Sequence, residues 1–195
     1  MRRFPGLLFL GVSLFSVSLF FSSACRGSRQ PEYTPTATIK DIMDSIVDPS
    51  ADVVWDSVAT VVSDSGSNEK APRTDEEWVN VRRGAIRLVE ATNLLLMPGR
   101  HVARPGEKSS TPNVELEPEE MEVLINKDRE AWNRRAKALH DSGLAALQAI
   151  DARDAKKLFD VGEEIDVACE NCHVQYWYPN EKIPTFPSEL KSSVR

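Results

Sequence analysis

Residues 154–178, DAKKLFDVGEEIDVACENCHVQYWY, decide the fold that the sequence predicts. Asp154 is a typical helix N-cap, and the apolar residues after it recur every three or four positions, as they do on one face of a helix. Pro179 cannot continue a helix, so we expect this one to end near Trp177. The face consists of Leu158, Val161, Ile165, Ala168, Cys169 and Cys172.

Two cysteines separated by two residues and followed at once by a histidine form the pattern of covalent c-type haem attachment. The thiols of Cys169 and Cys172 can add to the haem vinyl groups, and the imidazole of His173 can bind the iron. On a helix the three side chains share one face, because positions i, i+3 and i+4 are neighbours. We therefore expect one covalently bound haem c.

A zinc half-site and a disulfide are the alternatives for this motif. Zinc would need two further ligands, and Cys25, His101 and His140 have no matching spacing. A redox cysteine pair belongs to a βαβ setting, which the sequence does not indicate. Since no catalytic triad, paired carboxylates or nucleotide-binding loop is visible, we expect an electron carrier rather than an enzyme.

Residues 1–25 read as a secretory signal peptide, with two arginines, an uncharged run over residues 7–21 and small residues before Cys25. The run is too short and too rich in serine to indicate a membrane span. Cys25 follows Ala24 as the lipid-modified cysteine follows a small residue in bacterial lipoproteins, although Ser22 stands where an aliphatic residue is usual. Lipidation of Cys25 would anchor the chain to an envelope membrane. Ordinary cleavage after Ala24 is the alternative and would leave a periplasmic protein with a free thiol.

The chain expected after cleavage is acidic. Residues 1–25 hold two of the 24 Lys and Arg residues and none of the 30 Asp and Glu residues, which leaves eight more acidic than basic side chains. This balance argues against nucleic acid and favours soluble or basic redox proteins as partners. We expect a tether over residues 26–35, one cytochrome domain over 36–178 and an irregular tail over 179–195.

Three further helical regions precede the motif helix. The first has Ile39, Ile42, Met43, Ile46 and Val47 on one face, and Asp48-Pro49 then favours either a second short helix or a kink. The second begins with a capping box at Thr74 and Glu77 and stops before Pro98-Gly99. The third spans residues 118–150, with Asp128 interrupting its apolar stripe. Residues 58–62 could pair with residues 69–71 as a small β-hairpin.

Together these regions predict an all-α protein, an antiparallel four-helix bundle with one covalent haem and a small hairpin inserted. The motif on the last helix, Tyr176 after it and a methionine early in the first helix resemble the cytochrome c prime family, the class II c-type cytochromes. The resemblance covers residues 36–178. The chain departs from the family pattern at Pro49, at the hairpin and in the long segment over residues 98–117. Class I cytochromes do not fit, because no methionine follows His173.

The second axial ligand of the iron decides between two functions. Antiparallel packing would bring Met43, Met97, Met121 and His101 to the end of the bundle that holds the motif. Met43 also occupies the position where low-spin members of the resembling family carry their ligand. We therefore expect an electron carrier with His173 and Met43 on the iron, with Met121, His101 or an open position as alternatives.

An open position would instead favour a protein that binds NO or CO, or a weak peroxidase. Arg100 and Arg104 could bind the haem propionates or be solvated loop residues. We expect residues 98–117 to cover the haem edge or to contact a partner. Bundles of this kind often dimerise, and the sequence identifies no face for a homodimer.

Overall fold

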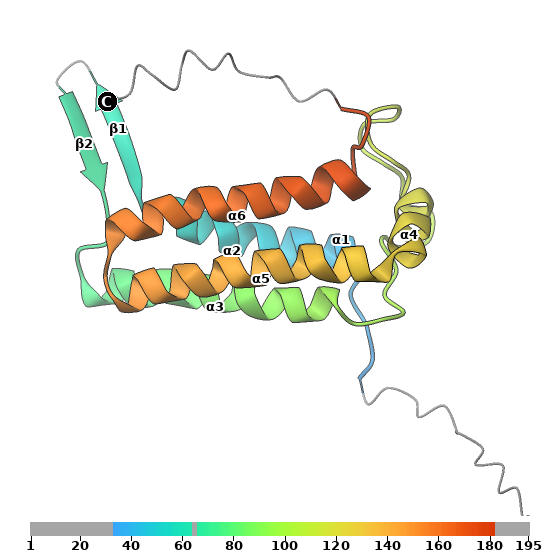
Figure 1. Ribbon diagram of the computed structural model, residues 1–195, viewed down its shortest axis with the longest axis horizontal. Helices are drawn as coiled ribbons and strands as arrows, with labels where there is room; N and C mark the ends of the chain where they lie inside the picture. The colour runs from blue at the N-terminus through green and yellow to red at the C-terminus, as the bar shows by residue number, and fades with distance from the viewer. Residues whose placement is uncertain (1–32, 64–65, 182–195) are drawn as a thin grey trace, which may run out of the picture. The chain divides into compact units, whose positions relative to one another are not determined.

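Helices make up most of the computed structural model, which describes residues 33–63 and 66–181 (Figure 1). The elements in chain order are α1 (Ile39–Ile42), η1 (Met43–Val47), α2 (Asp48–Trp55), β1 (Ala59–Ser63), β2 (Gly66–Lys70), α3 (Asp75–Leu95), α4 (Pro118–Lys127), α5 (Arg129–Asp151) and α6 (Ala155–Tyr176). The prediction of a helical chain with one small hairpin is confirmed.

The chain divides into two units, Met1–Thr34 and Pro35–Arg195. The predicted signal peptide, the predicted lipidation site at Cys25 and most of the predicted tail lie outside the described residues. Within the described ranges, no helix is both long enough and apolar enough to cross a membrane.

The first helical region is one continuous segment that contains a π-helical turn. The amide of Asp48 donates to the carbonyl of Met43, five residues back. Ile42 and Val47 are both buried and also lie five residues apart. On a regular α-helix this spacing would turn Val47 away from the core, and the wider π turn keeps both side chains on the core face. Asp48 does not cap a separate helix, since it is the first residue of α2 and this helix has no side-chain cap. Pro49 lacks the N–H of a regular α-helical residue, and the π turn directly before it accommodates this break.

The ends of α3 and α6 follow their predicted signals. The amide of Glu77 donates to the Thr74 hydroxyl over 3.2 Å, and the Glu77 carboxylate accepts from the Thr74 amide over 2.8 Å. Asp154 accepts from the amide of Lys157 over 2.9 Å and starts α6. The hairpin is antiparallel, with Ala59 opposite Lys70.

The prediction of one helix over residues 118–150 was wrong, because Asp128 divides it into α4 and α5. Its backbone leaves helical geometry, with φ −137° and ψ 76°, and its carboxylate accepts from the amide of Ala131 over 2.9 Å. The residue that interrupts the apolar stripe is therefore the N-cap of α5. Figure 1 shows α4 across the ends of the longer helices.

The long helices lie side by side: α3 packs against α2 and α5, and α6 packs against α2 and α5 (Figure 1). The core between them includes Val54, Leu88, Leu158 and Ile165, which are almost fully buried. Close contact of α2 with α3 requires a glycine at position 84, where an added Cβ would lie 2.6 Å from Val53. This packing brings the end of α6, the end of α3 and the starts of α1 and α5 to one end of the molecule.

We predict that Asp128→Ala lowers the free energy of unfolding by about 1 kcal/mol, because the first turn of α5 loses its acceptor. For a chain of this size the melting temperature should fall by about 2–4 °C. Thermal unfolding followed by circular dichroism measures the change. Asp128→Asn keeps an acceptor and should stay near the wild type, and an equal loss in both variants would contradict the capping role.

Candidate functional site

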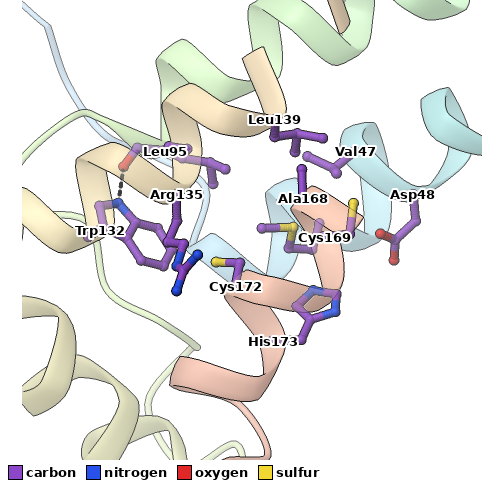
Figure 2. Close-up of a pocket in the computed structure, with 12 residues that line it drawn as sticks. Val47, Asp48, Leu95, Trp132, Arg135, Leu139, Ala168, Cys169, Cys172 and His173 are labelled. Carbon is purple, nitrogen blue, oxygen red and sulfur yellow. Dashed lines mark hydrogen bonds between the residues drawn. The ribbon is translucent and has the colours of Figure 1, made fainter. Parts of the chain in front are cut away.

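The motif side chains lie together at the end of α6 and face a cavity among the helices (Figure 2). This inner cavity has a volume of about 400 Å³, which counts its part open to solvent. Its wall is largely apolar, and it includes Cys169, Cys172, His173, Met43 and Asp48. The remaining lining residues are Val47, Leu95, Trp132, Arg135, Ala136, Leu139 and Ala168.

An outer cavity of about 900 Å³, which counts its part open to solvent, adjoins the inner one. Five residues line both cavities: Met43, Asp48, Trp132, Cys172 and His173. The two cavities therefore form one region that leads from the surface to the motif. Mostly apolar walls are typical of cofactor sites.

The loop between α3 and α4, over residues 98–117, forms part of the wall of this region. Lys108, Ser109, Ser110 and Glu115 of the loop line the outer cavity. The loop is tied to the rest of the chain at both of its ends. The Ile39 amide donates to the His101 carbonyl over 2.9 Å, and the Leu116 amide donates to the Trp177 carbonyl over 2.7 Å.

Both motif cysteines are free, half-buried thiols. Burial raises the pKa of Cys169 to about 12 and that of Cys172 to about 11. They are therefore protonated at neutral pH, whereas nucleophilic, redox and metal-binding cysteines have lowered pKa values. Of the candidate zinc ligands that lie within the described residues, His101 and His140 line neither cavity.

The imidazole of His173 is held neutral inside this region. Burial lowers its pKa, and the carboxylates of Asp48 and Glu170 oppose the shift only in part. The ring lies edge-on to Trp177, with 5.1 Å between centroids, and 5.9 Å from the ring of Tyr178. A neutral imidazole is the form that binds a metal ion.

Asp48 is a cavity residue that the sequence analysis missed as a site residue. Burial raises the pKa of its carboxyl, and His173 opposes the shift. Asp48 follows Met43 by five residues, which would be about 140° apart on a regular α-helix. The π turn is what lets both line the same cavity, and a reading based on α-helical spacing alone does not find Asp48.

The predicted second ligands of the iron lie in different places. Met43 lines both cavities, whereas Met121 lines only the outer one. Met97 and His101 line neither. The sulfur of Met97 lies 3.4 Å from an Arg100 nitrogen, and exposed His101 is 3.1 Å from the Glu122 carboxylate. Of the four candidates, Met43 alone lines the inner cavity together with Cys169, Cys172 and His173.

Arg100 and Arg104, predicted as propionate contacts, do not line either cavity. Arg100 donates to the carbonyls of Ala37 and Leu94, and Arg104 forms an ion pair with Asp41. Their propionate role stays a prediction. Arg135, which the sequence analysis passed over, is the arginine that lines the inner cavity. The sequence offers only a weak signal for it, its place one turn after Trp132.

His140 is half-buried between α5 and α3, with Nδ1 3.0 Å from the Thr92 hydroxyl. Across residues 33–63 and 66–181, no three His, Cys, Asp or Glu side chains are placed together as ligands of a metal ion. The chain matches no protein-family model, no curated protein and no solved structure with which it was compared. The interpretation of the cavity therefore depends on its own residues.

We predict that Arg100→Met lowers the free energy of unfolding by about 1–3 kcal/mol, because two partly buried carbonyls lose their donor. The loop over residues 98–117 should then be cleaved faster in limited proteolysis. Arg104→Met is the matched control, since its ion pair is exposed and contributes little. Equal proteolysis rates in the two variants would contradict an anchoring role for Arg100.

Proposed function

We propose that the protein is an exported monohaem c-type cytochrome that carries single electrons. The observation that carries this proposal is the placement of Cys169, Cys172 and His173 together on one wall of an apolar cavity. Two thiols and an imidazole on one helical face are the set that covalent haem attachment requires. No other chemistry suggested by the sequence uses all three.

The cavity residues fit a haem in their chemistry. The two thiols face the apolar space, where they could bond to the vinyl groups of a haem, and the neutral imidazole of His173 could bind its iron. The apolar wall of Val47, Leu95 and Leu139 would exclude water from the buried part of the group. When bound, the haem would supply reversible one-electron chemistry, and the protein would set its potential by axial ligands and burial.

Met43 is our candidate for the second axial ligand. It is the first residue of the π turn, and it lines both cavities together with His173 of α6. π turns inside α-helices occur frequently at functional sites. A methionine and a histidine on one iron favour a closed electron carrier over a centre open to small molecules.

Electron exchange would take place where the cavity reaches the surface. Trp177 lines the outer cavity, is 38 % exposed and contacts the His173 ring. The acidic excess of the chain would favour redox partners with basic surfaces. The packing of α2, α3, α5 and α6 supports the haem-binding four-helix bundle that the resemblance to class II cytochromes implies. Export and lipidation at Cys25 belong to the same proposal.

Covalent haem can be tested on the protein purified from a host that exports and attaches c-type haem. We expect a haem stain that survives denaturing electrophoresis and is lost in the double variant Cys169→Ala, Cys172→Ala. Cys25→Ser removes the third cysteine and should keep the stain. An unstained wild-type chain would overturn the proposed function.

The role of Met43 can be tested by absorption spectra of both redox states, with and without carbon monoxide. The wild type should be low-spin and resist carbon monoxide, and Met43→Ala should become high-spin and bind it. Met121→Ala is the control and should keep the wild-type spectrum. If the wild type already binds carbon monoxide readily, the gas-binding alternative replaces the electron carrier.

A further inference from the structure

Helix α6 and the residue after it carry a second row of side chains beside the stripe that enters the core. Steps of four, three, four, three and four residues place the members of this row on one face of the helix. The row begins and ends with exposed aromatic side chains, since Phe159 is 51 % and Trp177 is 38 % exposed. We call it the acidic face of α6, and it consists of Phe159, Glu163, Asp166, Glu170, His173 and Trp177.

The three carboxylates of this face have no cation beside them. Both lysines in the first turn of α6 pair with other carboxylates of the helix, over 3.1 and 3.5 Å. In the described part of the chain, no lysine or arginine lies within ion-pair distance of Glu163, Asp166 or Glu170. Lysines in the first turn and carboxylates after them are also the reverse of what the helix dipole favours. Neither ion pairing nor the stability of the helix therefore explains the acidic face.

Asp48 of α2 adds a fourth carboxylate on the same side of the motif. Burial raises the pKa of Cys169, and the charges of Asp48 and Asp166 add to this rise. Burial lowers the pKa of His173, and the charges of Asp48 and Glu170 oppose that change. Figure 2 shows the side chain of Asp48 beside Cys169 and His173. The negative charge of two helices is therefore concentrated where the motif reaches the surface.

The acidic face has the size and the composition of a protein interface. Its 18-residue span corresponds to about 27 Å along the helix, close to the width of a standard interface of roughly 800 Å² per partner. Aromatic side chains within a polar rim are typical contact points between proteins. Unpaired carboxylates around them select a partner of the opposite charge.

We propose that the acidic face of α6, with Asp48 beside it, is the docking surface for a protein that presents lysine or arginine side chains around an apolar patch. The basic side chains would pair with the carboxylates, and the apolar patch would cover Phe159 and Trp177. The Trp177 ring lies 5.1 Å from the ring of His173, so a partner docked here is next to the motif. That this partner exchanges electrons rests on the proposed haem function, whereas the docking does not.

The docking surface can be tested on the full chain without haem, with a synthetic amphipathic helix of lysine and leucine as the basic probe. Fluorescence anisotropy of the labelled peptide gives its dissociation constant at low and at physiological ionic strength. We expect Glu163→Gln combined with Asp166→Asn to weaken binding about fivefold at low salt, because two exposed ion pairs are lost. The difference should shrink as salt is added. Phe159→Ser should also weaken binding, since an apolar contact is removed.

Matched controls make the same changes elsewhere on the surface. Glu76→Gln combined with Glu90→Gln removes two exposed charges from α3, and Val123→Ser removes a side chain of α4 that is 65 % exposed. Both controls should bind the peptide as the wild type does. An equal loss in the two double variants would show a response to net charge alone and would overturn the proposal.

Two other occupants of the acidic face give different results. If Lys182→Gln combined with Lys191→Gln makes the peptide bind more tightly, residues 182–195 occupy the face in place of a partner. A wild-type dimer that is lost in the Glu163→Gln, Asp166→Asn variant would assign the face to a second copy of the chain. Either result would overturn the proposal.

Electron exchange with small inorganic reagents tests the same surface on the haem-loaded chain. Glu163→Gln combined with Asp166→Asn should slow exchange with the hexaammineruthenium cation and accelerate exchange with the ferricyanide anion. Rates that do not change would count against the surface. A haem-stained chain that does not bind the peptide would reject the docking surface and leave the proposed function. An unstained chain that binds the peptide at this face would reject the proposed function and support the docking surface.

Discussion

The site depends on α6 using one helical face for two purposes. Its earlier turns place Leu158 and Ile165 in the core, where both are fully buried. The same face, continued toward the C-terminal end, carries Cys169 and Cys172 into the cavity wall. Because core and cavity share one stripe, the packing that holds α6 against α5 and α2 also fixes the motif. A rotation of α6 would remove the thiols from the cavity and Leu158 from the core together.

Local signals in the sequence were sufficient for most helix ends but not for two irregular positions. Thr74 and Asp154 each accept a hydrogen bond from the backbone amide three residues later, so the sequence alone predicts these two N-caps. Asp128 lies within a stripe that continues on both sides, and only its backbone geometry shows that it ends one helix and caps the next. The π turn was hidden because Met43 and Ile46 maintain ordinary helical spacing around the five-residue step from Ile42 to Val47.

The arginines show why site residues are harder to predict than helices. Arg100 and Arg104 follow α3 at the correct end of the molecule, and this placement was predictable from topology. Whether a guanidinium group faces a cavity depends on which hydrogen-bond acceptors lie around it in the folded chain. Arg100 donates to the carbonyls of Ala37 and Leu94 and therefore does not line the cavity. Arg135 faces the cavity because Gln175, forty residues later, turns it there. Such pairings arise only in the folded chain.

The bond between Leu116 and Trp177 has a consequence for the order of assembly. Trp177 follows the last residue of α6, and the loop it secures comes from the middle of the chain. The mouth of the outer cavity can therefore close only after α6 has been synthesised to its end and has docked. Any ligand of this region would have two routes inward: before that docking, or while the Leu116–Trp177 bond is open. The last helix thus carries the motif residues, and the residue directly after it holds the loop in place.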